Sequence, residues 1–143
     1  MLLGEYHHSV DQKGRMAIPA KFRDSLGSGA IITRGLDSCL FVFGRKEWDE
    51  LAAKLTALPI TQANARAFVR LMLAGATDVD TDAQGRILVP EYLRAYAGLK
   101  KEVIVTGLYN RAEIWDKDAW EKYKAKTESS SEDIAEQLRE LGI

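Results

Sequence analysis

The chain has 143 residues, of which 46% are hydrophobic and 29% are charged, and its formal net charge is −1. This length suits one domain or two very small ones, and the single cysteine, Cys39, excludes an intramolecular disulfide. The net charge neither supports nor excludes DNA binding, because local charge governs attraction to phosphate over about 8–10 Å.

The chain begins with an expected strand over residues 3–10. Its first residues contain neither a basic leader nor an apolar stretch long enough for a signal peptide or a membrane span. We therefore expect a soluble, cytoplasmic protein with no membrane partner. His7 and His8 are adjacent in this strand, so their side chains face opposite sides and cannot bind one metal ion together.

An internal repeat dominates the sequence. Residues 11–23 read DQKGRMAIPAKFR, and residues 82–94 read DAQGRILVPEYLR. The Asp, the Gly, the Pro and both Arg residues recur at an offset of 71 residues, and Gly35-Leu36 matches Gly107-Leu108 one residue later. A repeat of this kind indicates one supersecondary unit used twice. Because there are only two copies, a pseudo-symmetric pair is expected rather than an open array.

Each copy starts with a segment typical of a hairpin turn. The Asp carboxylate suits the first turn position, where it accepts hydrogen bonds from backbone N–H groups further along the turn. The Gly stands where the backbone needs positive φ, and the Arg opens the following strand. The turn residues are Asp11, Gly14 and Arg15 in the first copy, and Asp82, Gly85 and Arg86 in the second.

A short helix and a pair of strands follow each turn. Pro19 and Pro90 suit the first turn of a helix, where the missing N–H is no loss. The side chains expected on the inward faces are Phe22 and Leu26 in one helix, and Leu93 and Tyr96 in the other. The expected strand pairs are 30–33 with 40–43, and 102–106 with 113–115.

Four further helices are predicted from apolar stripes at helical spacing. They cover residues 45–58, 61–74, 117–126 and 130–141. A small barrel cannot bury all of these stripes. We therefore expect the helix that carries Trp48 or the one that carries Trp120 to pack against a neighbouring subunit of a cyclic homo-oligomer.

The domain boundaries follow from the repeat. We expect DNA-binding repeats at 5–47 and 76–119, a helical connector at 48–75, and C-terminal helices with an acidic tail at 120–143. A half of about 70 residues rarely folds stably without a disulfide or a metal. The two copies are therefore expected to share one core, most simply as an intertwined barrel.

The turn arginines have two interpretations. Arg15 and Arg86 can simply pair with their own aspartates, and such surface ion pairs contribute little stability. Alternatively, each turn presents an arginine fork with Lys13 or Gln84 beside it. Arginine binds guanine O6 and N7 through two hydrogen bonds, and a two-stranded ribbon is narrow enough to enter the major groove.

Charge is unevenly distributed between the copies. Residues 1–35 carry five bases and three acids, residues 76–107 carry four bases and five acids, and residues 128–143 carry one base and five acids. Asp78 and Asp80 crowd the second turn. This segment lacks the Gly and the closing Glu of a calcium loop, so an acidic strand end exposed to solvent is the simpler interpretation.

No group of residues points to catalysis. The sequence contains no nucleophile elbow, phosphate-binding glycine loop, zinc ligand set or catalytic triad. Cys39 has no assigned base and is interpreted as a small core residue. We therefore expect no enzyme activity, no cofactor and no metal.

Through these motifs, the sequence resembles the MraZ family of bacterial transcription regulators. The resemblance extends from the first residues to the helix that carries Trp120. It implies a mainly β fold with peripheral helices, in which two AbrB-like hairpin repeats intertwine into one swapped-hairpin barrel per chain. The family's motif arginines correspond to Arg15 and Arg86, and its turn aspartates to Asp11 and Asp82.

The resemblance also implies a function. The expected protein is a repressor associated with the nucleoid, which binds double-stranded DNA at tandem, short, guanine-rich repeats upstream of a division and cell-wall gene cluster. A ring-shaped homo-oligomer would present many hairpins to such repeats. One departure from the pattern is Gln84, which stands where the first copy has Lys13. The second turn is therefore expected either to make a weaker DNA contact or to serve mainly the fold. The alternative is an AbrB-type antitoxin or scaffold that binds a protein partner.

Overall fold

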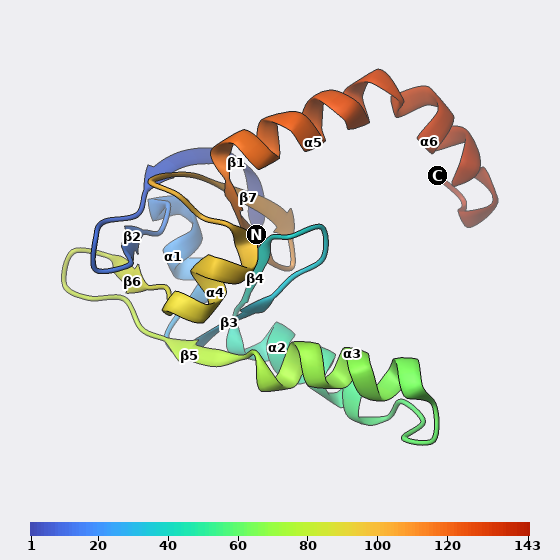
Figure 1. Cartoon of the computed structure of the whole chain (residues 1–143), viewed down its shortest axis with the longest axis horizontal. Coiled ribbons are helices and arrows are strands. Elements are labelled where there is room, and N and C mark those ends of the chain that lie inside the picture. The colour runs from blue at the N-terminus through green and yellow to red at the C-terminus, as the bar shows by residue number, and fades with distance from the viewer.

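Eight strands and six helices follow one another along residues 1–143, all of which the computed structural model describes (Figure 1). The strands are β1 (Leu2–Ser9), β2 (Arg15–Ala17), β3 (Ala30–Arg34), β4 (Leu40–Phe43), β5 (Thr77–Val79), β6 (Arg86–Leu88), β7 (Glu102–Tyr109) and β8 (Ala112–Asp116). The helices are α1 (Ala20–Leu26), α2 (Arg45–Thr56), α3 (Ala63–Ala74), α4 (Glu91–Ala97), α5 (Lys117–Ser129) and α6 (Ser131–Gln137), followed by the 3-10 turn η1 (Arg139–Leu141). Helices contain more residues than strands, so the fold is mixed, and the prediction of a mainly β protein was wrong.

The two halves of the chain are joined strand by strand. The larger sheet has the order β1-β7-β8-β4-β3-β5, and β2 pairs with β6 in a separate two-stranded sheet. The pairs β1–β7, β4–β8, β3–β5 and β2–β6 all connect one half to the other. The predicted hairpins β3–β4 and β7–β8 are also present.

The strands do not form a closed barrel. The six-stranded sheet ends at β1 and β5, each of which has a paired neighbour on one side only. The short strands β2 and β6 pair with each other instead of bridging these two edges. The closed swapped-hairpin barrel expected from the resemblance is therefore not seen, although the two copies are intertwined through their strand pairing.

Both halves contribute to the main core, a cluster of 19 buried residues. Phe22 and Leu40 come from the first half, and Leu93 and Val105 from the second, and each is at most 1% exposed. Burying one such side chain contributes about 1.5–3 kcal/mol. Because each half packs against the apolar side chains of the other, the core belongs to the chain as a whole.

Helices α1 and α4 begin directly after Pro19 and Pro90, so each proline stands at the N-cap, one position before the first turn predicted for it. Phe22 and Leu26 are buried under α1, but in α4 the second inward residue is Ala97. Tyr96 is 36% exposed, and its hydroxyl donates a hydrogen bond to the carbonyl of Gly35 at 2.7 Å. The prediction that Tyr96 faces inward was wrong because the residue four positions after Leu93, not three, lies on its buried face.

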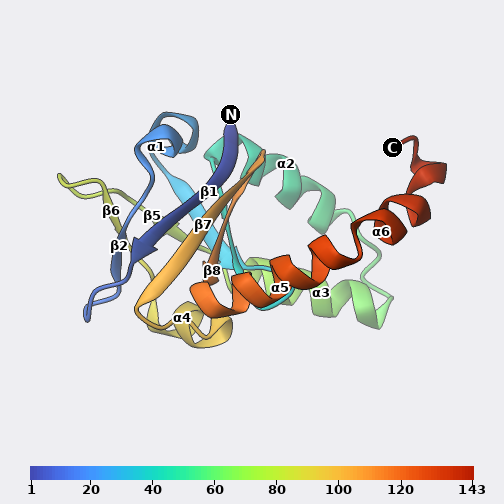
Figure 2. The ribbon, with the colours of Figure 1, turned by 90° about the horizontal axis from the view of Figure 1, so that it is seen from above.

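The long helices lie at the end of the molecule opposite β2 and β6 (Figures 1 and 2). Trp48 is buried against Phe43, with ring centroids 5.7 Å apart. Trp120 packs on Trp115 at 5.2 Å. Both rings are thus occupied within their own subunit, which leaves them less available for the intersubunit packing expected above.

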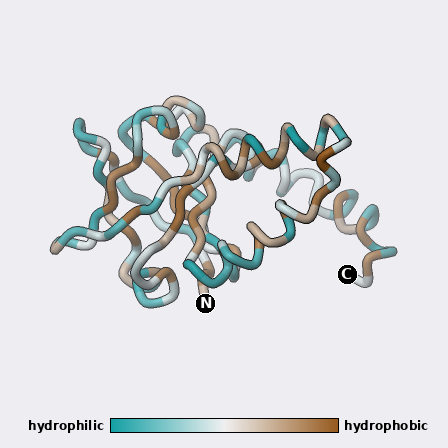
Figure 3. Tube along the Cα trace, turned by 90° about the horizontal axis from the view of Figure 1, so that it is seen from below, coloured by the Kyte–Doolittle hydropathy of each residue, from teal (hydrophilic) through white to brown (hydrophobic).

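The C-terminal helices contact the rest of the subunit through the start of α5, where Ala119 and Trp120 pack against the smaller core cluster. α5 runs to Ser129, beyond the predicted end at 126, and neither α5 nor α6 has a buried residue. Hydrophobic residues mark the central strands and recur along the outer helices toward the C-terminus (Figure 3). None of the helices combines the length and the apolar character that crossing a bilayer requires.

Candidate nucleic-acid interface

The two Asp-x-x-x-Arg turns have the same internal geometry. In the first, Asp11 Oδ1 accepts hydrogen bonds from the backbone N–H groups of Lys13 and Arg15, both at 2.9 Å. Its Oδ2 accepts a third bond from Arg15 Nε, also at 2.9 Å. Asp82 makes the same three bonds at the same distances to Gln84 N, Arg86 N and Arg86 Nε. One carboxylate therefore organises each turn and orients its arginine.

The glycines of the turns adopt the backbone expected for them. Gly14 has φ of 85° and Gly85 has φ of 75°, a region in which residues with a Cβ are strained. Each glycine N–H closes the turn by donating to the carbonyl of its aspartate, at 3.0 Å in both turns. The glycine position thus lets the chain turn tightly enough for the carboxylate to reach the arginine.

Hydrogen bonding lowers the pKa of both turn aspartates. For Asp11 the largest cause is the bond from the backbone N–H of Arg15, and for Asp82 it is the bond from the backbone N–H of Arg86. The carboxylates stay ionised at neutral pH. The negative charge that holds each guanidinium in place is therefore present under ordinary conditions.

The two turns lie side by side because the ribbon that carries them is shared. Strand β2 pairs with β6 of the other copy rather than with β1, to which it is linked only by a bridge between Val10 and Met16. Ile18 N donates to the carbonyl of Gly85 at 3.1 Å, and Val89 N donates to that of Gly14 at 2.8 Å. The expected two-stranded ribbon thus exists, but it contains one strand from each copy.

The shared ribbon brings both motif arginines to one end of the molecule (Figures 1 and 2). Arg86 Nη1 lies 4.0 Å from Asp11 Oδ2, so the carboxylate of the first turn is close to both guanidinium groups. The side chains of Arg15 and Arg86 are 36% and 30% exposed. Lys13 and Gln84 are exposed beside them.

Arg23 and Arg94, the second arginines of the repeat, have a structural role that the sequence pattern did not predict. Arg23 Nε donates to the carbonyl of Ile18 at 3.2 Å, and its guanidinium lies against Gly85 of the other copy. Arg94 Nε donates to the carbonyl of Val89 at 3.0 Å and lies against Gly14. A Cβ on either glycine would collide with the opposing guanidinium. Each copy therefore supports the turn of the other. In the sequence, the recurrence of this arginine at the same offset as the turn residues was the feature that could have indicated such a role.

The first turn has the more basic surroundings. A shallow hollow of about 480 Å³ beside Asp11 is lined by Arg94, Lys100 and Lys101. Lys100 Nζ pairs with Asp116 Oδ2 at 3.0 Å, whereas Lys101 is exposed and makes no ion pair. In the first copy the corresponding loop, residues 27–29, reads Gly-Ser-Gly and carries no charge. The extra lysines are thus contributed to the first turn by the second copy.

The second turn has the more acidic surroundings. Asp78 and Asp80, which precede it, are exposed, and Asp78 pairs only with Arg45 at 3.4 Å. The charge asymmetry noted in the sequence is therefore larger in three dimensions. The chain contains no group of three His, Cys, Asp or Glu side chains placed to hold a metal ion.

Other reactive side chains are occupied elsewhere. Cys39 is fully buried, and burial raises the pKa of its thiol, so the sulfur stays protonated and shielded. Its Sγ donates to the carbonyl of Leu36. His7 Nε2 pairs with Glu102 on the neighbouring strand β7.

Comparisons with known proteins agree across the whole length. The family profile described as "MraZ protein, putative antitoxin-like" matches twice, at residues 1–71 and 72–141. A protein of Acetivibrio thermocellus named transcriptional regulator MraZ is 53% identical over 143 residues, which is 100% of both chains. A protein of the same name from Desulforamulus reducens is 50% identical over 141 residues, covering 99% of each chain. The double match follows the internal repeat, and the chain belongs to the MraZ family.

Proposed function

We propose that this chain is a sequence-specific DNA-binding regulator of transcription whose paired arginine turns contact base edges. The observation that carries the proposal is the placement of two identically built Asp-x-x-x-Arg turns side by side on one shared ribbon. The names of the full-length relatives, transcriptional regulator MraZ, support the same class of function.

The arginine geometry suits a base contact. Each motif arginine is bound to its aspartate through Nε, and its side chain makes no other hydrogen bond within the chain. The two terminal amino groups of Arg15 and Nη2 of Arg86 are therefore left for an acceptor, while Arg86 Nη1 lies 4.0 Å from Asp11 Oδ2. Guanine O6 and N7 form the paired acceptor that such a fork binds in the major groove. The aspartate holds the guanidinium in advance, so less conformational entropy is lost on binding.

The surrounding cations have a different role in this proposal. Lys13 and Lys101, together with Arg94, would attract phosphate oxygens, which position the protein without reading sequence. Residues 5–47 and 76–119 would then act as the two DNA-binding repeats, with the first making the stronger contact.

Tandem DNA repeats would be bound by several subunits at once. One pair of turns per short, guanine-rich repeat binds weakly, but linking subunits in a ring makes later contacts intramolecular. The proposed operator lies upstream of a division and cell-wall gene cluster, and occupancy there would block polymerase and repress transcription in the nucleoid.

The direct test is a titration of the purified protein with labelled DNA from upstream of its own gene, followed by fluorescence anisotropy. We expect saturable binding that a scrambled duplex of the same composition does not compete away. Equal competition by the scrambled duplex would contradict sequence-specific binding.

The alternative is an antitoxin or scaffold that binds a protein partner, in keeping with the "antitoxin-like" wording of the family description. This alternative predicts a second protein in stoichiometric amount when the chain is purified from its native host. The DNA-binding proposal predicts that the protein purified alone retains full affinity for its operator.

A further inference from the structure

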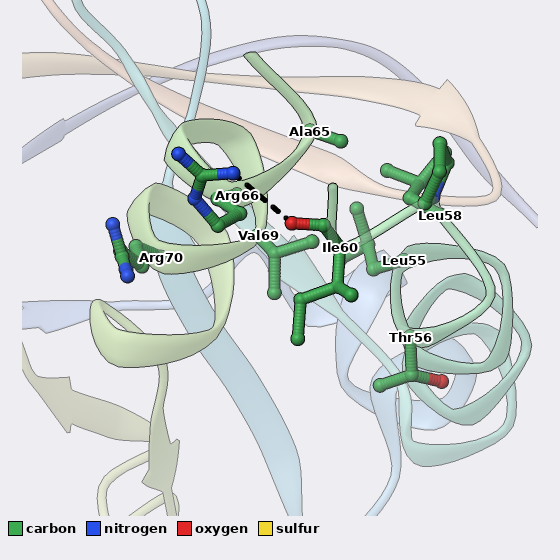
Figure 4. A pocket seen from close by; sticks show the side chains of 9 residues that line it. Leu55, Thr56, Leu58, Ile60, Ala65, Arg66, Val69 and Arg70 are labelled. Carbon is green, nitrogen blue, oxygen red and sulfur yellow. Dashed lines mark hydrogen bonds between the residues drawn. The ribbon is translucent and has the colours of Figure 1, made fainter. Parts of the chain in front are cut away.

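One exposed apolar side chain lies at the same end of the molecule as the turns. Others lie at the opposite end, such as Leu58 and Ile60, which line a pocket of about 310 Å³ between α2 and α3 (Figure 4). Leu88 belongs to strand β6 of the shared ribbon and is 56% exposed. It is the only large apolar side chain that is exposed in residues 10–19 and 81–90, which form the turns and the ribbon. Single exposed leucines are common on proteins, so its surroundings decide what it does.

The shared ribbon has one buried face and one outer face, because side chains alternate along its strands. Met16 and Ile87, at the centre of the two strands, are 1% and 3% exposed and belong to the main core. The side chains on either side of them point away from the core, and these are Arg15, Ala17, Arg86 and Leu88. The outer face therefore carries both motif arginines and two apolar side chains.

The strand register places Leu88 beside the arginine of the first turn. Arg15 lies directly opposite Leu88, and Arg86 lies directly opposite Ala17. Residues directly opposite each other in an antiparallel pair have Cβ atoms about 4.5–5.5 Å apart. A ligand that binds Arg15 on the outer face therefore lies next to the leucine side chain.

The major groove offers a match for an arginine and a leucine placed side by side. Guanine presents the O6 and N7 acceptors that an arginine fork binds, whereas thymine presents its C5 methyl group, which apolar side chains contact. Phosphate oxygens, by contrast, offer an apolar side chain nothing to contact. The outer face of the ribbon therefore suits base edges that include a guanine and a neighbouring thymine.

We propose that Leu88 contacts the C5 methyl group of a thymine beside the guanine that Arg15 binds, and that this contact contributes to sequence specificity. The contact rests on the proposed function, because it requires the ribbon to lie in the major groove. It combines the two repeats, since Arg15 comes from the first and Leu88 from the second.

The other half of the ribbon does not repeat this contact. Ala17 corresponds to Leu88 at the offset of 71 residues and is half-buried opposite Arg86. Its side chain ends at Cβ, so it extends less far from the ribbon than that of Leu88. The thymine is therefore expected only in the half of the site that Arg15 binds, and the protein binds the duplex in one orientation.

Replacement of single thymines by deoxyuridine tests the contact, because it removes the C5 methyl group and keeps the groups that pair with adenine. The probe is a duplex with one binding site from upstream of the gene, titrated by fluorescence anisotropy. Deoxyuridine at one thymine should weaken wild-type binding about three- to fivefold, as expected for one buried methyl group. The neighbouring guanine should be sensitive to replacement by 7-deazaguanine, which lacks the N7 acceptor.

Leu88→Ala identifies the residue that contacts the methyl group. This variant should bind the unmodified duplex at least threefold more weakly than the wild type, and deoxyuridine at the sensitive thymine should cost it no further affinity. Lys13→Ala is the first control: it should weaken binding through a lost phosphate contact and keep the full sensitivity to deoxyuridine. Ile60→Ala is the second control: it truncates an exposed apolar side chain at the opposite end and should bind both duplexes like the wild type.

The possible failures separate this contact from the proposed function. Sequence-specific binding that no single deoxyuridine weakens would overturn the contact alone, and so would an equal loss from deoxyuridine in the wild type and in Leu88→Ala. Binding that does not distinguish the operator from a scrambled duplex would contradict the proposed function, and the contact with it. If Leu88→Ala alters the circular dichroism spectrum, Leu88→Gln gives the same comparison, because its side chain is of similar length and has no methyl group.

Discussion

At each turn a single carboxylate decides where an arginine points. Asp11 binds the backbone through one oxygen and Arg15 Nε through the other, so the guanidinium cannot rotate without breaking the bond at 2.9 Å. The ion pair is partly exposed and by itself adds little stability. Its importance lies in the orientation of the arginine.

The first prediction concerns that arginine. Arg15→Ala should leave folding intact and weaken specific DNA binding by about 5- to 150-fold, which corresponds to the roughly 1–3 kcal/mol of a bidentate guanine contact. Arg15→Lys is the control, because it keeps the charge but not the planar fork, and should lose specificity as well. Anisotropy titrations against operator and scrambled duplexes measure both effects. Normal operator affinity of Arg15→Ala would refute the assignment.

The second prediction concerns the difference between the copies. Lys13→Ala should weaken binding to any duplex and reduce the slope of log K against log salt by about 0.9, the effect of one lost phosphate contact. Gln84→Ala removes no charge and should leave the slope unchanged. Equal slopes for the two variants would show that the asymmetry has no consequence for DNA binding.

The third prediction concerns pH. Because folding lowers the pKa of Asp11 and Asp82, their contribution to turn stability is complete above the unfolded pKa, near 3.8, and is lost as pH falls through the lower folded value. The turns should therefore stay ordered from neutral pH to about pH 4 and loosen below it. NMR titration of the two carboxyl carbons measures the midpoints. A midpoint at or above 3.8 for either residue would contradict the hydrogen-bonded geometry.

At the scale of elements, each short helix stabilises the turn of the opposite repeat. Arg23 in α1 lies against Gly85, and Arg94 in α4 lies against Gly14. The support is mutual because β2 of the first repeat pairs with β6 of the second. A change in one helix is therefore transmitted to the turn that is distant in sequence.

The fourth prediction tests this crossed arrangement. Arg23→Ala should speed amide hydrogen exchange at Arg86 more than at Arg15, and Arg94→Ala should do the reverse. Both reporter amides donate to their turn aspartates, so faster exchange reports loosening of that turn. If each substitution affects mainly the turn of its own repeat, the arginine does not stabilise the turn of the other repeat.

At the scale of the whole molecule, the turns and the long helices occupy opposite ends (Figure 2). An oligomer joined through the helices would therefore leave the turns free on its surface. The apolar stripe of the helix at 45–58 suggests Leu55→Glu as a change that would split such an oligomer. This variant is unsuitable for the test. Leu55 is only 3% exposed and belongs to the core of its own subunit, so a glutamate there would disturb folding first.

The fifth prediction links assembly to affinity. The wild type should bind a duplex with several tandem repeats about 10²- to 10⁴-fold more tightly than a duplex with one repeat, because later contacts are intramolecular. Protein diluted until it sediments as single subunits should show little difference between the two duplexes. Anisotropy titrations with one to four repeats measure the ratio, and an equal gain for the diluted and the assembled protein would rule out avidity from the ring.

Much of the candidate site was predictable from the sequence because its bonds are local. Asp11, Gly14 and Arg15 interact within five residues, so their order along the chain already determines the turn. The same holds for the prolines that begin α1 and α4, and for the strand pairs β3–β4 and β7–β8, which are joined by short connections.

Only the tertiary structure decided which strands of different halves would pair. No local pattern specifies that β2 pairs with β6, that Arg23 rests on Gly85, or that the sheet stays open at β1 and β5. These features depend on contacts between segments about 70 residues apart in the sequence, where packing of the shared core selects the partner. The repeat predicted two equivalent turns, and long-range pairing placed them together.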